Sequence, residues 1–338
     1  MRVGAIDCGT NSIRLLVADM PPAETELSPG DGGSCETGRT RQGEPIRQDE
    51  PMREVLRRME VVRLGKGIDD TGVIAPDSMA RTLAMCAEYA AQSRELGVDR
   101  MRFVATSATR DAANAAEFIT GVTTAFAAWG IGPEVVSGAQ EAQLSFDGAT
   151  AGLAADGIPG PYLIVDLGGG STEFVRGDAA IEAGLSVDMG CVRFTERHLR
   201  SDPPTLAEIE AATTEIDAAL DRVEAEVGLS EIASLVGLAG SVTTVTAYAL
   251  GLPTYERDRI HRSVLAVADV IAACAGLLSM TRAERAQLGF MHSGRVDVIG
   301  AGALIWSRIV TRVSQCSGLS EVVTSEHDIL DGIALSLR

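Results

Sequence analysis

The sequence predicts an α/β protein made of two related domains with a cleft between them. A strand–turn–strand motif occurs twice, at residues 6–12 and at residues 165–171, and both copies place Asp, Gly and Ser at matching positions after an apolar lead-in. Strands and helices follow each copy in a similar order, and 338 residues are enough for two separate cores. Ligands of such folds bind outside the strand ends, so function is expected in the cleft.

The first half opens with strands at residues 3–7 and 12–19, on either side of the first turn, and a third strand is expected at residues 55–64. Residues 21–52 are rich in Pro, Gly, Glu and Thr, a composition typical of a flexible insertion. The functional alternative for this segment is a partner-binding tail or a flap over the substrate.

Helices and strands then alternate towards the middle of the chain. Pro76 occupies the favoured first position of a helix that ends near Gly97. Asn114 with Glu117 three residues later forms a capping-box pattern for a second helix, which ends near Gly130. The other elements expected here are strands at residues 101–106 and 134–137 and a helix from Gly138 to residue 153.

The second half repeats this order. A strand at residues 162–166 leads through the second glycine turn into a hairpin that ends near Asp188. Thr205 and Glu208 form another capping box, which opens a long amphipathic helix. The remaining expected elements are a buried strand at residues 234–238 followed by a helix, helices at residues 264–280 and 296–313, a strand at residues 321–324 and a last helix at residues 326–337.

Composition limits the classes of function. A formal net charge of −18 argues against a nucleic-acid-binding protein, and it requires any phosphate site to be locally positive. The six cysteines are scattered without a CxxC pair, which indicates a reducing, cytoplasmic location. No signal peptide is expected, and the apolar stretches at residues 234–252 and 264–280 are interrupted or too short to span a membrane.

The segment from Asp166 to Glu173 carries the sharpest chemical signal. Three consecutive glycines are more than a tight hairpin needs, so backbone N–H groups are expected to hold a phosphate here. Asp166 and Glu173 flank the turn from opposite strand ends and offer the oxygen ligands that Mg²⁺ prefers, with Mn²⁺ as its alternative. The phosphate-binding candidates of this turn are Gly168, Gly169, Gly170, Ser171 and Thr172.

The first turn is a weaker signal, because Asp and Gly followed by Asn also make a good hairpin. Its value comes from pairing with the second copy. We expect the first turn to face the second across the cleft, with Asp7 as another carboxylate for the cation. The phosphate-binding candidates of the first turn are Gly9, Thr10, Asn11 and Ser12.

Other candidates have structural alternatives. Arg110 follows a strand and either binds phosphate or pairs with a carboxylate such as Asp111. On composition alone, Glu141 is best explained as an acid that complements the dipole in the first turn of a helix. The functional alternative is a general base. Gly240 and Ser241 lie at a strand–helix turn that could bind an anion or could serve only close packing. Three arginines are also plausible anion contacts, although each is better explained singly as a surface residue: Arg193, Arg262 and Arg295.

Together these segments resemble the exopolyphosphatase / guanosine pentaphosphate phosphohydrolase (Ppx/GppA) family, in its short two-domain form, within the actin–sugar kinase–Hsp70 superfamily. The resemblance covers nearly the whole chain. It implies two duplicated actin-like (ASKHA, ribonuclease H-like) α/β domains, formed by residues 1–137 with 326–338 and by residues 138–325. The motifs that carry it, in the family's order and spacing, are residues 7–12, 105–110, 137–142, 166–173 and 237–241.

The resemblance also implies roles for single residues. Glu141 matches the catalytic base, and Arg110 matches an arginine that grips the substrate phosphate. Asp166 and Glu173 match the carboxylates that hold Mg²⁺ and the attacking water. The two glycine turns match the phosphate loops, and a homodimer is implied by analogy with family members.

The implied activity is hydrolysis of the terminal phosphate of inorganic polyphosphate. The alternatives are removal of the 5′-phosphate of guanosine pentaphosphate, phosphate transfer from ATP by a kinase of the same superfamily, and an alarmone sensor without activity. No nucleic-acid or membrane partner is expected.

Overall fold

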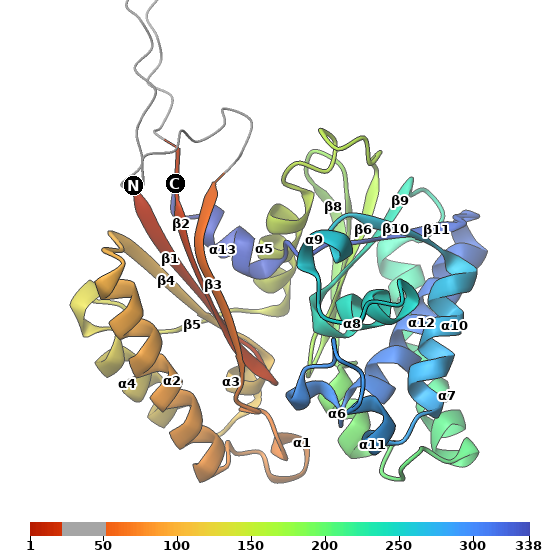
Figure 1. Cartoon of the computed structure of the whole chain (residues 1–338), viewed down its shortest axis with the longest axis horizontal. Helices are drawn as coiled ribbons and strands as arrows, with labels where there is room; N and C mark the ends of the chain where they lie inside the picture. The colour runs from red at the N-terminus through yellow and green to blue at the C-terminus, as the bar shows by residue number, and fades with distance from the viewer. Residues whose placement is uncertain (22–51) are drawn as a thin grey trace, which may run out of the picture.

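The computed structural model describes residues 1–21 and 52–338. Two α/β lobes lie next to each other, and each is built around one β-sheet (Figure 1). We call the lobe that contains the N-terminus the first lobe and the other the second lobe. Apart from its two end residues, the insertion expected at residues 21–52 lies outside the described residues.

The sheet of the first lobe contains five strands, which are β1 (Arg2–Cys8), β2 (Ser12–Asp19), β3 (Arg53–Val61), β4 (Arg100–Ala105) and β5 (Glu134–Val135). Their spatial order is β3-β2-β1-β4-β5. The first three form an antiparallel meander, whereas β1 pairs in parallel with β4 and β4 with β5.

Helices cover both faces of this sheet, because alternate side chains of the central strands point to opposite faces. Ile6 of β1 packs with α2 (Pro76–Glu95) and α4 (Ala115–Ala125), whereas Ala5 packs with α13 (Ile329–Leu335) on the other face. The expected start of α2 at Pro76 is confirmed. The short helices of this lobe are α1 (Ile68–Thr71), α3 (Ser107–Asp111) and η1 (Ala127–Trp129).

The sheet of the second lobe repeats this topology. It contains β6 (Tyr162–Leu167), β7 (Thr172–Gly177), β8 (Ile181–Val187), β9 (Ser234–Leu238), β10 (Ser263–Ala266) and β11 (Glu321–Thr324). β6, β7 and β8 form the meander, and β6 pairs in parallel with β9 and β9 with β11. β10 adds one antiparallel strand at the edge. The predicted duplication is therefore present in the strand order itself.

The core of the second lobe lies under five helices around Trp306, the largest fully buried side chain. These helices are α6 (Cys191–Arg197), α7 (Leu206–Val227), α8 (Ala239–Ala249), α10 (Val267–Ser279) and α12 (Ile299–Ser317). The shorter elements are α9 (Arg257–Ile260), α11 (Arg282–Arg285) and η2 (Ser293–Arg295). No helix in the described part of the chain is long and apolar enough to cross a membrane.

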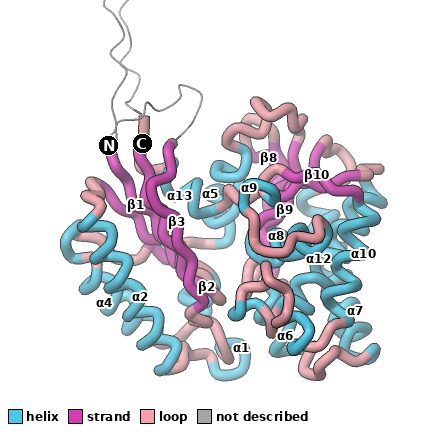
Figure 2. The backbone as a smooth tube through the Cα atoms, viewed as in Figure 1, coloured by secondary structure: helices cyan, strands magenta, loops and turns pink. Residues whose placement is uncertain are grey.

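One further helix, α5 (Gly138–Thr150), lies between the two sheets together with α13 (Figure 2). Ala142, Phe146 and Ala149 of α5 are buried against the second sheet at the predicted helical spacing, together with Leu153, which lies beyond the end of the helix at Thr150. α13 packs on α5 and on β1 and β2. The domain boundaries at residues 137 and 325 stay a prediction.

Several local expectations are corrected. The capping box at Thr205 and Glu208 is confirmed, but Asn114 does not cap α4, because its side chain bonds both backbone polar groups of Ile74. The helix expected at residues 264–280 begins as the strand β10 and becomes helical only at Val267. The third strand and the helices expected at residues 296–313 and 326–337 are shifted by two to four residues at both ends.

Candidate active site

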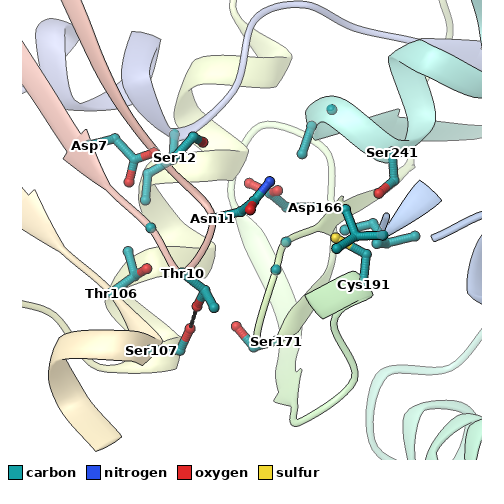
Figure 3. A pocket seen from close by; sticks show the side chains of 18 of the residues that line it. Asp7, Thr10, Asn11, Ser12, Thr106, Ser107, Asp166, Ser171, Cys191 and Ser241 are labelled. Carbon is teal, nitrogen blue, oxygen red and sulfur yellow. Dashed lines mark hydrogen bonds between the residues drawn. The ribbon is translucent and has the colours of Figure 1, made fainter. Parts of the chain in front are cut away.

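The two glycine turns meet in a cleft between the lobes, which contains about 770 Å³ of space that is partly open to solvent. Each turn is closed in the same way. The N–H of Gly9 donates to the carbonyl of Ser12, and the N–H of Gly168 donates to the carbonyl of Ser171, both at 3.0 Å. Figure 3 shows the two turns on opposite sides of the cleft. The repeat in the sequence is therefore also a repeat of geometry.

The turns approach each other so closely that a side chain on the second one would crowd Thr10 and Ser107 of the first lobe. A Cβ atom on Gly169 would lie 3.0 Å from Cβ of Thr10, and one on Gly170 would lie 2.7 Å from Oγ of Ser107. The Thr10 and Ser107 hydroxyls are themselves hydrogen-bonded at 2.8 Å (Figure 3). Backbone N–H groups are thus brought together without intervening side chains, as phosphate binding requires.

Glu141 lies at the start of α5 and lines the cleft. The helix begins with a capping box between Ser137 and Gln140, which fixes the position of its first turn. Only 8% of Glu141 is exposed. Burial raises the pKa of this carboxyl well above its ordinary value, repulsion by Glu173 raises it further, and the nearby Arg110 opposes both. A carboxyl with a raised pKa is better suited to accept a proton at neutral pH than an exposed one.

Asp166 and Glu173 lie opposite each other in register at the ends of β6 and β7. Burial, with added repulsion from Asp328, raises the pKa of Asp166 to about 6, and burial with repulsion from Asp166 raises that of Glu173 to about 7. Each carboxylate accepts a hydrogen bond from a serine, Asp166 from Ser145 at 2.6 Å and Glu173 from Ser186 at 2.7 Å. Asp166 lines the cleft, whereas Glu173 is buried behind it.

Asp7 also lines the cleft, but its carboxylate is engaged by an arginine. Arg14 donates to Asp7 at 2.7 Å and also pairs with Asp328 at the start of α13. Among residues 1–21 and 52–338, no three His, Cys, Asp or Glu side chains gather in a way that would hold a metal ion. Arg14 pairs with Asp7, so Asp7 as a third carboxylate of the cation site beside Asp166 and Glu173 stays a prediction.

Three other candidates are placed differently from expectation. Arg110 donates to the carbonyl of Val136 at 2.6 Å and to Glu141 at 3.3 Å, so its carboxylate partner is Glu141 and not Asp111. Thr172 is fully buried and its hydroxyl donates to the carbonyl of Met189, which leaves no hydroxyl for a phosphate. Gly170 faces a smaller adjoining cavity instead of the main cleft.

The opposite wall of the cleft is formed by the first turn of α8. Gly240 and Ser241 line it as expected, and Arg295 lies directly on Gly240, where a Cβ atom would come within 2.3 Å of its guanidinium carbon. Arg295 donates to Thr244 at 3.3 Å and forms no ion pair with any carboxylate of the described residues. Its positive charge is thus available to the cleft. Arg262, by contrast, pairs with Asp156 outside it.

The cleft-lining residues that sequence reasoning missed include Arg14 and Cys191. The thiol of Cys191 is buried, and burial raises its pKa, so it stays protonated and is a poor nucleophile. Arg14 sits one residue past Ile13 on β2, and only its cross-strand position opposite Asp7 could have indicated its role.

Comparison with known proteins decides the family. Residues 45–337 match the model of the Ppx/GppA phosphatase family. The chain belongs to the Ppx/GppA family. This confirms the expected family and the expectation of a hydrolase.

Relatives of the Ppx/GppA family match the chain over its full length. It is 42% identical to a protein of Mycobacterium tuberculosis (strain CDC 1551 / Oshkosh) named Exopolyphosphatase 2, over 99% of this chain and 98% of that one. A crystal structure of an exopolyphosphatase-like protein agrees with a TM-score of 0.87 at 38% identity, covering 100% of this chain and 98% of that one. The Ppx/GppA enzyme of Aquifex aeolicus agrees with a TM-score of 0.75 at 26% identity over 99% of both chains. The expected α/β class with two lobes built on repeated sheets is confirmed, whereas its actin-like, ribonuclease H-like assignment stays a prediction.

Proposed function

We propose that this chain hydrolyses the terminal phosphate of inorganic polyphosphate by direct attack of water. The observation that carries the proposal is the meeting of two glycine turns beside Glu141 and Asp166 in one cleft. Backbone N–H groups of the turns would hold the terminal phosphate, Arg295 would add positive charge in the cleft, and Arg110 would add positive charge from its position beside Glu141. The name of the 42% identical relative supports polyphosphate as the substrate.

Glu141 is the proposed general base. It would orient a water molecule against the phosphorus and accept its proton, and its burial keeps its basicity suited to neutral pH. The hydrogen bond from Arg110 would fix the direction of the carboxylate. No side chain needs to form a covalent intermediate, because water can attack the phosphorus in line with the departing phosphate.

The carboxylates fit a Mg²⁺ ion in the manner usual for phosphoryl transfer. Mg²⁺ is commonly bound by one or two carboxylates together with water and substrate phosphates, so a cluster of three protein ligands is not required. Asp166 on the cleft wall and Glu173 behind it supply those oxygens, and their mutual repulsion indicates an acidic edge that favours a cation. When bound, Mg²⁺ would neutralise part of the charge of the polyphosphate.

Guanosine pentaphosphate is the second candidate substrate. The cleft extends from the glycine turns to Gly240, Ser241 and Arg295, so it has length beyond a single phosphate group. Transfer to an acceptor, as in a kinase, is not favoured, because the family is one of phosphatases.

The experiment is phosphate release from short polyphosphate, long polyphosphate and guanosine pentaphosphate, each with Mg²⁺ and with EDTA. We expect Mg²⁺-dependent release, fastest from polyphosphate. Faster release from guanosine pentaphosphate would assign the second candidate, and binding of either compound without any release would contradict hydrolysis.

A further inference from the structure

Arg193 of α6 connects the two lobes behind the glycine turns. Its Nε donates to the carbonyl of Gly170 at 2.8 Å, its Nη2 donates to Asp111 at 2.9 Å, and its Nη1 pairs with Asp69. Asp69 belongs to α1 and Asp111 to α3, both in the first lobe, and α1 lies next to α6 at the bottom of Figure 1. The sequence suggested Arg193 as an anion contact, but all three of its nitrogens are used by protein oxygens.

The position of this arginine matters because it binds the second turn where that turn is in contact with the first lobe. Gly170 of the second turn lies against Thr10 and Ser107 of the first lobe, where even a Cβ atom would not fit. α3 carries Ser107 at one end and Asp111 at the other, and Ser107 is hydrogen-bonded to Thr10. The guanidinium of Arg193 therefore connects the two turns. It binds the second turn directly at Gly170, and it reaches the first turn through Asp111 and Ser107 of α3.

The electrostatics of this contact differ from those of an ordinary surface pair. The Arg193 side chain is only 13% exposed and meets two carboxylates of the opposite lobe, so its attraction is screened less than that of exposed ions. Neighbouring contacts between the lobes are weaker. Arg197 reaches Asp69 at 2.9 Å but is 39% exposed, and Glu196 accepts from the N–H of Gly67 at 3.2 Å.

We propose that Arg193 is a positioning residue that sets the distance and alignment of the two glycine turns across the cleft. It does not line the main cleft, so it acts through Gly170 and α3 without touching the substrate. The inference rests on the proposed function, in which both turns hold the same terminal phosphate. Misplacement by about 1 Å costs about 10²-fold in rate when reacting groups must be aligned. Loss of Arg193 should therefore lower kcat more than it raises KM.

The test compares Arg193→Met, which keeps an apolar stem, with Arg193→Lys, Asp111→Ala and the double variant Arg193→Met/Asp111→Ala. The matched control is Arg308→Met, which breaks an ion pair with Asp217 at 2.8 Å inside the second lobe. Phosphate release gives kcat and KM. Hydrogen–deuterium exchange of the peptides that contain the two turns, measured without substrate, reports their alignment independently of activity.

For Arg193→Met we expect kcat to fall by about 10- to 100-fold with a smaller change in KM, and faster exchange in both turns. Arg193→Lys should recover only part of this, because one ammonium cannot reach three acceptors. The double variant should be no worse than Arg193→Met, since both changes remove the same link. The control should match the wild type.

Wild-type kcat and exchange in Arg193→Met, or additive effects in the double variant, would overturn the proposal. If Arg193→Met does not fold, the milder variant Asp111→Ala tests the proposal in its place. Wild-type kcat and wild-type exchange of the two turns in that variant would then overturn the proposal. Absence of phosphate release from the wild type would contradict the proposed function alone, because the exchange measurement still tests whether Arg193 aligns the turns.

Discussion

Glu141 has the setting of a proton acceptor and not of a surface glutamate. It is buried at a helix start near the acids Glu173, Asp166 and Asp7, and Arg110 donates a hydrogen bond to it. The helix dipole alone, which explains the residue on composition, would not require burial beside Glu173. The surroundings of the carboxyl therefore favour the functional alternative that the sequence left open.

Replacement of Glu141 by Gln should remove the base while keeping its size. We expect kcat to fall by about 10²- to 10⁴-fold with little change in KM, because the loss affects proton transfer and not binding. The measurement is steady-state phosphate release from polyphosphate. Glu117→Gln, the same change on the exposed face of α4, is the control. Similar rates for both variants would refute the role of Glu141.

Ser145 is a residue whose role only the structure shows. It lies one helical turn after Glu141 and donates to Asp166 at 2.6 Å, so it links the helix of the proposed base to the proposed metal ligand. For Ser145→Ala we expect about 10- to 100-fold weaker apparent binding of Mg²⁺. Thermal stabilisation of the protein by Mg²⁺ measures this without turnover. Unaltered stabilisation would show that Ser145 does not position Asp166.

At the level of elements, the capping box predicted from the sequence is present at the start of α7. The Thr205 hydroxyl accepts from the N–H of Glu208, and the Glu208 carboxylate accepts from the N–H of Thr205 at 2.8 Å. Loss of the first contact in Thr205→Ala should lower the free energy of unfolding by about 1 kcal/mol. Urea unfolding is the measurement, with Thr214→Ala in the middle of α7 as a comparison. An equal or larger loss at Thr214 would contradict the capping explanation.

The same pattern fails at α4 for a reason that the sequence cannot contain. Asn114 and Glu117 have the spacing of a capping box, but Ile74, forty residues earlier, offers Asn114 two backbone partners at 2.8 and 3.0 Å. Tertiary contacts override the local preference there. The glycine turns were predictable because each is one continuous segment with its own hydrogen bond.

Residues that depend on distant partners were missed or misassigned for the same reason. Arg14 meets Asp328 across most of the chain, and Arg193 meets Asp69 from the opposite lobe. Nothing near either arginine in the sequence indicates its partner. The repeat predicted that the same order of strands and helices along the chain would occur twice, whereas the edge strand β10 was hidden in an apolar stretch that suggested a helix.

At the scale of the whole molecule, a half-buried pair of histidines joins the segment between β11 and α13, which contains His327, to the segment between α9 and β10, which contains His261. The rings of His261 and His327 are 4.3 Å apart. Burial lowers the pKa of His261 to about 3, and the charges of His327 and the arginines Arg57, Arg257 and Arg262 oppose its protonation further. Burial also lowers the pKa of His327, although Asp331 acts in the other direction.

This pair should make the fold sensitive to acid. Unfolded histidine binds a proton below a pKa of 6.5 whereas folded His261 does not, so the unfolded state gains protons and stability falls as pH decreases from about 6.5 towards 3. We expect His261→Gln to reduce the pH dependence of the free energy of unfolding in this range by about one proton. Urea unfolding at several pH values is the measurement, and an unchanged slope would contradict the assignment.

The account as a whole depends on attack by water on a phosphate held between the two glycine turns. Hydrolysis of polyphosphate in water enriched in ¹⁸O, followed by mass spectrometry of the products, tests this most directly. We expect each released phosphate to carry one ¹⁸O atom from the solvent, with none in the shortened polymer. Label in the polymer, or released phosphate without label, would contradict the account.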